Sequence, residues 1–209
     1  MVKTAPPLGR REQLLDAATV CFAEQGYNAA KVSDVVARAG VAQGTFYLYF
    51  KSKREVLLAL FERFCQALLD ACGSDDDLPT TLEAYRERML ARARQVLRVT
   101  LEQRPLAAVF FKEALGADPD LERQLRAFHD AMAELTKRRL RRAMELGLIR
   151  PVDAEVAAYA ISGMWERVVA HCLLMSPHPT DPDQLAEQVV SLQLDGLARR
   201  PSQGGSTST

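Results

Sequence analysis

The sequence has few of the residues that build metal, redox or disulfide sites. Its 209 residues include three histidines and four cysteines. The cysteines, which have no zinc-ribbon or redox spacing and each fall in an apolar helical pattern, are Cys21, Cys65, Cys72 and Cys172. They are most simply core thiols in a reducing cytoplasm. Because His129 and His171 are too scattered to form a metal site, we expect no metal and no cofactor.

Long apolar runs are also missing. No run approaches the roughly 20 residues of a membrane span, and the N-terminal stretch MVKTAPPLGRRE lacks the apolar core of a signal peptide. Hydrophobic residues make up 48% and charged residues 26% of the chain, as in ordinary soluble globular proteins. We therefore expect a cytoplasmic protein that does not bind membranes.

Patterns that carry enzyme chemistry are absent as well. The sequence has no Ser/His/Asp order, no metal-ligand cluster, no glycine loop that would bind phosphate, and no close carboxylate pair on one apolar face. We expect no catalytic residues and no enzyme activity.

The net charge is zero, but the charges are unevenly distributed. Residues 1–54 carry eight Lys/Arg and four Asp/Glu, which leaves 19 basic and 23 acidic residues for the rest. A basic front and an acidic rear fit a chain whose N-terminal part meets a polyanion, although a small basic face is often simply solvated.

Strand-like alternation is missing too, so the sequence predicts an all-α fold with about nine helices. Glycine and proline mark most of the expected breaks. The expected helices are about Gly9–Gln25, Val32–Ala39, Gln43–Phe50, Lys53–Cys72, Thr81–Gln103, Leu106–Leu115, a helix from just after Pro119 to Leu146, Asp153–Leu174 and Asp181–Arg199.

The stretch GVAQGTFYLYFKSK, residues 40–53, has an unusual amphipathic pattern. On a helix, Phe46 and Phe50 form an i, i+4 apolar pair, while Gly44, Thr45 and Leu48 point the opposite way. Tyr47 and Tyr49 lie on the two flanks. This face suits a helix in a DNA groove, and it equally suits a core helix with surface tyrosines; the stretch alone leaves both interpretations open.

The neighbouring residues favour DNA. The helix expected at Val32–Ala39 is followed by Gly40, a natural left-handed residue for a tight turn, and then by the aromatic helix. Two short helices joined in this way form a helix-turn-helix. Ser52 and Glu55 have the spacing of a capping box for the next helix.

The N-terminal third resembles the TetR family of bacterial transcriptional regulators, over about residues 10–65. The residues that match the family pattern in order and spacing are Gly26-Tyr27, Asp34-Val35-Val36, Ala39-Gly40-Val41, Gly44-Thr45-Phe46-Tyr47, Tyr49-Phe50 and Lys53. Lys31 and Ala42 depart from it, since relatives often have a hydroxyl at these positions. Losing an N-cap hydroxyl costs about 1 kcal/mol, and at position 42 it also removes a candidate phosphate contact.

The resemblance implies that the chain binds an operator in double-stranded DNA. Tyr47, Tyr49 and Lys53 would hold phosphates, and Gln43, Thr45 and Leu48 would face base edges. Gln43 suits adenine and Leu48 suits thymine methyl groups. The expected DNA-binding residues are Ser33, Gln43, Gly44, Thr45, Tyr47, Leu48, Tyr49, Lys51 and Lys53.

We expect two domains: a DNA-binding domain at residues 1–52, with a flexible arm at 1–8, and a helical ligand-binding and dimerisation domain at 53–200. Residues 201–209 have the composition of a disordered tail.

A homodimer is expected because one recognition helix reads too short a sequence; two would read a near-palindromic operator. By resemblance, the last two helices form the interface. The expected interface residues are apolar, or small enough to permit close packing of helices. They are Val156, Ala160, Gly163, Met164, Val168, Leu185, Val189 and Leu192. These residues could instead be buried within one subunit.

The resemblance also implies a small-molecule site in the body, whose occupancy shifts the protein off DNA. The expected lining residues are Met89, Phe110, Phe111, Phe128, Met132 and Trp165. These suit an apolar effector such as a fatty-acyl derivative, although at helical spacing they also suit a plain core. The arginines of the Thr81–Gln103 helix favour solvated positions, but one could meet an anionic ligand group.

The expected function is therefore that of a ligand-released repressor acting on the bacterial nucleoid. Two alternatives remain: a helical DNA-binding protein without ligand gating, and a transcriptional activator.

Overall fold

The structure is a computed structural model, and it describes residues 8–73, 79–113, 119–178 and 180–197. For Leu8 and residues 111–113 it describes the backbone alone. The tail expected at 201–209 and the arm expected at 1–8, apart from Leu8, lie outside the described residues.

Helices account for all the regular secondary structure of the described residues. They are α1 (Leu8–Gln25), α2 (Val32–Ala39), α3 (Gln43–Tyr49), α4 (Lys53–Cys72), α5 (Leu82–Glu102), α6 (Arg104–Glu113), α7 (Pro119–Glu145), α8 (Ala154–Val169), the π-helix η1 (Ala170–Met175) and α9 (Pro182–Leu197). The prediction of an all-α fold with about nine helices is confirmed.

Two helix boundaries follow the local chemistry read from the sequence. Gly40 has φ 63° and ψ 34°, the left-handed conformation that ends α2 in a tight turn. The Ser52 hydroxyl accepts a hydrogen bond from the Glu55 backbone N–H at 3.3 Å and caps α4. The Glu55 carboxylate reaches one residue farther back than a standard capping box, to the Lys51 backbone N–H at 2.7 Å.

The two positions that lack a capping hydroxyl are handled differently. At Lys31 the Asp34 carboxylate accepts a hydrogen bond from the Lys31 backbone N–H at 2.9 Å, so half of the capping arrangement of α2 remains. At Ala42 the cap has no side-chain hydrogen bond, and the first turn of α3 begins with the Thr45 N–H to Ala42 carbonyl bond at 2.8 Å.

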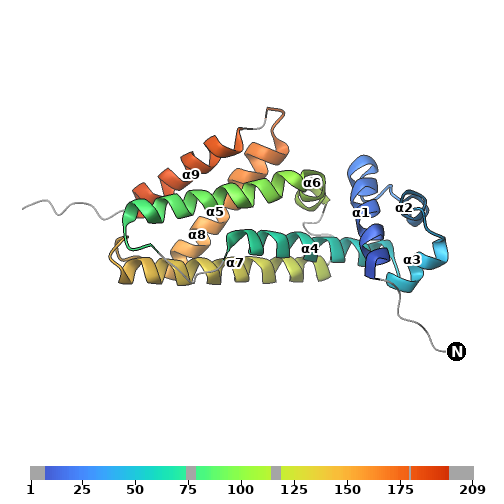
Figure 1. Ribbon diagram of the computed structural model, residues 1–209, viewed down its shortest axis with the longest axis horizontal. Helices are drawn as coiled ribbons and strands as arrows, with labels where there is room; N and C mark the ends of the chain where they lie inside the picture. The colour runs from blue at the N-terminus through green and yellow to red at the C-terminus, as the bar shows by residue number, and fades with distance from the viewer. Residues whose placement is uncertain (1–7, 74–78, 114–118, 179, 198–209) are drawn as a thin grey trace, which may run out of the picture.

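Helices α1, α2 and α3 form a compact head at one end of the molecule, and α4 runs from this head into the body (Figure 1). The head core contains side chains that are at most 1% exposed, among them Leu14, Ala18, Phe22, Val35 and Phe46. Arg63 of α4 pairs with Glu12 and Asp16 of α1 at 3.2 and 2.9 Å.

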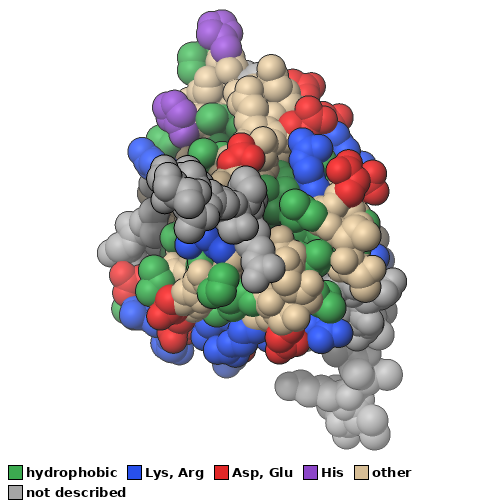
Figure 2. All heavy atoms as spheres, turned by 90° about the vertical axis from the view of Figure 1, so that its left-hand side faces the viewer, with side chains coloured by type: hydrophobic (Ala, Val, Ile, Leu, Met, Phe, Trp, Pro, Cys, Tyr) green, Lys and Arg blue, Asp and Glu red, His purple; other side chains and the backbone are tan. Residues whose placement is uncertain are grey.

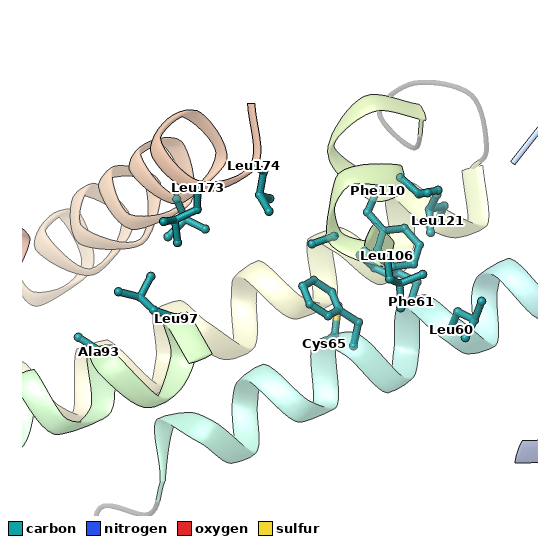
Figure 3. Close-up of a cluster of buried hydrophobic side chains, with 14 of the residues drawn as sticks. Leu60, Phe61, Cys65, Ala93, Leu97, Leu106, Phe110, Leu121, Leu173 and Leu174 are labelled. Carbon is teal, nitrogen blue, oxygen red and sulfur yellow. The ribbon is translucent and has the colours of Figure 1, made fainter. Parts of the chain in front are cut away.

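In the body, α5 and α7 lie lengthwise beside α4 (Figure 1), while α8 packs on α7 and α9 packs on α5. Arg94 of α5 pairs with Asp183 and Glu187 of α9, both at 3.0 Å. Near the head, side chains from α4, α6 and α7 meet in one apolar cluster, with η1 alongside (Figure 3). Arg54 at the start of α4 forms an ion pair with Asp120 at the start of α7.

The helix expected at Asp153–Leu174 is not uniform. It is α-helical to Val169 and then continues as the six-residue π-helix η1. Hydrophobic spacing does not report a change from i→i+4 to i→i+5 hydrogen bonds, so the sequence could not indicate it.

The end of the body opposite the head carries mixed side chains. Basic, acidic and hydrophobic groups are interspersed over this surface (Figure 2). It does not have the single positive sign expected of a surface that binds DNA.

Candidate nucleic-acid interface and body cavity

Helix α3 is anchored in the head by its two phenylalanines. Phe46 is fully buried and Phe50 is 4% exposed, and their ring centroids lie 5.9 Å apart. The guanidinium of Arg11 lies 5.4 Å from the centroid of the Phe50 ring. The i, i+4 pair therefore faces inward, and the remaining residues of α3 point toward the surface.

The outer face of α3 is open. Leu48 is 66% and Tyr47 53% exposed, and Gln43 and Gly44 are also exposed. A Cβ at Gly44 would meet nothing within 4 Å, so a partner backbone can approach closely there. These side chains offer amide donors and acceptors, a phenol and an aliphatic group, which together can read base edges and hold phosphate.

Other expected DNA-binding residues lie in different surroundings. Ser33 and Lys51 are exposed. Thr45 and Tyr49 are half-buried, because each lies at the edge of the face that α3 packs on the head.

Lys53 has hydrogen-bond partners inside the chain. Its Nζ donates to the backbone carbonyls of Tyr27, Asn28 and Ala30 at 2.5, 3.2 and 2.8 Å. The same ammonium lies 4.5 Å from the centroid of the Tyr27 ring. An ammonium has three N–H donors, and all three are used inside the chain, so Lys53 holds the α1–α2 turn in this structure, and its phosphate contact stays a prediction.

A cavity of about 260 Å³ lies in the body, enclosed by α4 to α9. Its walls are mostly apolar. The apolar lining includes Phe61, Phe64, Cys65, Leu68, Met89, Phe110, Leu121, Leu125, Phe128, Met132, Ile161 and Trp165. An apolar cavity of this kind can hold a hydrophobic small molecule.

The structure brings five of the six expected lining residues together around this cavity: Met89, Phe110, Phe128, Met132 and Trp165. For the sixth, Phe111, the structure describes the backbone alone. Sequence reasoning missed Phe61 and Phe64 of α4, which line the cavity. It expected the arginines of the Thr81–Gln103 helix to be mostly solvated and left open that one meets an anionic ligand group; Arg92 lines the cavity.

Several polar side chains of the cavity wall have partners inside the chain. Thr100 and Thr136 donate to the carbonyls four residues earlier, both at 2.9 Å. His129 lies 3.2 Å from Glu166, which joins α7 to α8 across the wall. The indole N–H of Trp165 donates to the side-chain oxygen of Gln193 of α9 at 3.3 Å.

Burial also changes the acidity of two groups that line the cavity. It raises the pKa of the Cys65 thiol to about 12, so this cysteine is a neutral thiol and a poor nucleophile at neutral pH. Burial raises the pKa of Tyr85 as well, while the positive charges of Arg92 and Arg139 act in the opposite direction.

The expected interface residues divide into two groups. Val156 and Leu192 are 67% and 65% exposed, Ala160 and Gly163 are exposed, and Met164 and Val168 are half-buried. Tyr159, which the sequence reading missed, adds a half-exposed ring, and its hydroxyl donates to Asp130 at 3.2 Å.

Leu185 and Val189 of α9 differ from the other expected interface residues. They are 3% and 5% exposed because they face the core of the single chain, where α9 packs on α5. The alternative of burial within one subunit therefore holds for these two residues, and we leave them out of the candidate interface.

One aromatic side chain connects the cavity to the head. The ring of Phe110 on α6 lies 4.7 Å from that of Phe61 and 5.9 Å from that of Phe64, both on α4 (Figure 3). Helix α6 also packs on α1 of the head. A molecule in the cavity would thus touch a residue of α6, the helix that packs on both α1 and α4.

The described helices include none that is long and apolar enough to cross a membrane. Within the same described ranges, no group of three or more His, Cys, Asp or Glu side chains is placed to hold a metal ion.

Two family models match the chain. The model described as bacterial regulatory proteins, tetR family, matches residues 14–60, which cover most of the head and the start of α4. The model described as tetracyclin repressor-like, C-terminal domain, matches residues 83–171, from α5 to the start of η1. Together the two models cover more than half of the chain.

Whole-chain relatives agree with these matches. The HTH-type transcriptional regulator YdgC of Bacillus subtilis is 29% identical over 191 residues, which are 90% of this chain and 92% of that protein. The structure of the fatty acid degradation regulator FadR from Bacillus halodurans superposes with a TM-score of 0.76 at 26% identity, covering 95% of this chain and all of that one. The transcriptional regulator FadR from Bacillus subtilis, in complex with stearoyl-CoA, gives 0.75 at 25% identity and covers 88% and 98%.

The role of Lys53 leads to a stability prediction. Lys53→Met removes three charge-assisted hydrogen bonds to the α1–α2 turn, so it should lower the free energy of unfolding by about 1.5–3 kcal/mol. Lys51→Met, at an exposed position two residues away, should change it by less than about 0.5 kcal/mol. Urea unfolding at one fixed protein concentration measures both. If the two variants have equal free energies of unfolding and Lys53→Met loses affinity for DNA, Lys53 instead contacts a phosphate.

Proposed function

The chain belongs to the TetR family of bacterial transcriptional regulators, and from this we propose that it is a repressor released from its operator by an apolar effector. The family binds DNA through a helix-turn-helix, which here is α2–turn–α3. In this proposal residues 1–52 are the DNA-binding domain and residues 53–200 the ligand-binding and dimerisation domain. The protein acts in the cytoplasm, on the nucleoid.

For DNA recognition, α3 lies in the major groove with its exposed face toward the bases. Gln43 pairs with adenine, and Leu48 contacts thymine methyl groups. Tyr47, Tyr49, Lys51 and Ser33 hold phosphates, and Gly44 allows close approach to the backbone. The exposure of Gln43, Gly44, Tyr47 and Leu48, against the burial of Phe46 and Phe50, supports this orientation.

The protein is a homodimer in this proposal, and its operator is near-palindromic. The interface is formed by α8 and α9 of each subunit, through Val156, Ala160, Gly163, Met164, Val168 and Leu192. Two exposed aliphatic side chains, Val156 and Leu192, and the half-exposed ring of Tyr159 support it. Exposed apolar groups that cluster on one face commonly mark protein–protein contacts.

The observation that carries the gating proposal is the cavity, because its wall includes the residue that touches the head-bearing helix. A ligand that fills the cavity presses on Phe110, which rests on Phe61 and Phe64 of α4. A shift of α4 and α6 changes the spacing of the two heads and lowers the affinity for DNA. The similar FadR structure from Bacillus subtilis was solved with stearoyl-CoA, which supports a fatty-acyl effector here.

Two readings compete with a gated repressor: a DNA-binding protein without gating, and an activator. Wild-type protein that stays on its operator at all fatty-acyl concentrations favours the first. A target promoter whose output falls, rather than rises, when the chain is deleted favours the second.

DNA readout gives one prediction. Gln43→Ala should relax base preference at one position of each half-site and leave the rest of the operator unchanged. Tyr47→Phe, which removes a phosphate contact alone, should weaken binding to all sequences alike. Selection of bound DNA from a random pool measures both preferences. Uniform loss of affinity in Gln43→Ala would remove this residue from base readout.

The subunit interface gives a second prediction. Val156→Arg places a charge at the centre of the candidate interface, so sedimentation at micromolar concentration should show a monomer where the wild type shows a dimer. Leu82→Arg, at an apolar residue that is 44% exposed on α5, is the matched control and should stay dimeric. A monomeric wild type, or a dimeric Val156→Arg, would place the interface elsewhere.

Gating gives a third prediction. Val96 lines the cavity, so Val96→Trp fills part of it and should require at least about ten times more stearoyl-CoA to release operator DNA. DNA binding without ligand should be retained, because Val96 lies in the body. Gln95→Trp, at the exposed neighbouring position, should behave as wild type. DNA-binding anisotropy measures the release. Equal release from Val96→Trp and wild type would place the effector outside the cavity.

A further inference from the structure

The cavity has one end that is rich in hydrogen-bond donors. Tyr85 and Arg92 of α5 and Arg139 of α7 all line it. The Arg139 Nη2 donates to the carbonyls of Cys72 and Gly73 at 2.9 and 2.8 Å, at the end of α4. These bonds fix the Arg139 guanidinium where α4 ends, and α4 begins at the head and runs away from it into the body (Figure 1).

The positive charges of Arg92 and Arg139 both act on the phenol of Tyr85. Tyr85 is 5% exposed, and the positive charges of both arginines act on its pKa against the effect of burial. Both guanidinium groups therefore lie within electrostatic range of the Tyr85 phenol, although the three residues come from two different helices. A phenol and two cations that meet at a cavity wall suit a carboxylate or phosphate oxygen.

The other end of the cavity is apolar. Phe61, Phe64, Phe110 and Leu121 line it, next to the head, in the cluster of Figure 3. From Leu121 to Arg139, α7 rises by about 27 Å at 1.5 Å per residue. The lining residues are therefore spread along α7, with Leu121 and Arg139 at opposite ends of that spread.

A carboxylate on the wall restricts where an anion can bind. Glu166 is the one acidic side chain among the described lining residues, and it pairs with His129 at 3.2 Å. His129 precedes Arg139 on α7 by a rise of about 15 Å. Glu166 therefore disfavours an anionic group beside His129, whereas Arg92 and Arg139 attract one.

We infer that the effector is an amphiphile with an anionic head, held by Arg92, Arg139 and Tyr85, and with a hydrocarbon chain that runs toward Phe110. This rests on the proposed function, since it names the ligand class and its direction in the gating cavity. The hydrocarbon tail of the ligand, and not its anionic group, then presses on Phe110 of α6, the helix that packs on α1 of the DNA-binding domain. The length of the hydrocarbon chain therefore determines whether DNA is released.

The test uses the fluorescence of Trp165, the one tryptophan of the chain, which lines the cavity. Stearate and methyl stearate, titrated below their aggregation concentrations, differ in the charge of the head. Stearate should bind the wild-type protein about ten to a hundred times more tightly, as hydrogen bonds to a charged group predict. Laurate, with the same head and a shorter chain, should bind but release DNA poorly.

Two variants test whether Arg92 causes the preference for stearate over methyl stearate. Arg92→Gln should remove most of the preference for stearate and leave the affinity for methyl stearate unchanged. Arg86→Gln, at an exposed position on the same helix, should keep the preference. Arg139 is left intact because it also caps α4. Thermal unfolding checks that both variants fold as the wild type does.

Stearoyl-CoA separates two sources of the anionic head. Binding tighter than stearate, and weakened by Arg92→Gln, assigns the head to a phosphate-bearing group; weaker binding assigns it to a free carboxylate. Equal affinity for stearate and methyl stearate overturns the inference, yet leaves gating intact if both ligands release DNA. An Arg92→Gln variant that matches Arg86→Gln with every ligand also overturns it. If no ligand binds or releases DNA, both the inference and the proposed gating fail.

Discussion

The packing of Phe110 against Phe61 and Phe64 is the contact on which the rest of the molecule depends. It closes the head end of the cavity, and it holds α6 on α4 while α6 also packs on α1. The apolar side chains of α4 therefore pack against two parts of the molecule, the head and the body. Its first turns complete the core of the head through Val56 and Leu60, and its later turns form a wall of the cavity. Close-packed cores do not deform gradually, so a change on one side of α4 is transmitted to the other.

Local patterns indicated most of the fold. The apolar spacing located the helices, Gly40 located the turn, and the Phe46–Phe50 pair decided which side of α3 faces inward. Each of these depends on a few residues that are neighbours in sequence. The ordered match over residues 10–65 added the family, which local periodicity could not supply.

The features that the sequence did not indicate depend on residues that are distant in the chain. Lys53 is committed to the α1–α2 turn by carbonyls 23 to 26 residues earlier. Leu185 and Val189 are apolar, like Leu192, and α5 alone decides which of them face the core. Arg92 resembles the other arginines of α5 in sequence, but in the fold it lines the cavity. Packing between helices determines the environment of all these residues. The pattern of polar and apolar residues along the sequence would be the same whether they were buried or exposed.

Because α4 packs against both the head and the body, it also affects how the chain folds during synthesis. A ribosome releases α1 to α4 first, and the head can bury its core from these helices alone. The far flank of α4, with Phe61 and Phe64, stays uncovered until Phe110 follows about 50 residues later. At 5–20 residues per second this interval is roughly 3–10 seconds. During each round of synthesis a finished DNA-binding head is therefore attached to an exposed aromatic strip, and chaperones have their best opportunity to bind the nascent chain at that strip.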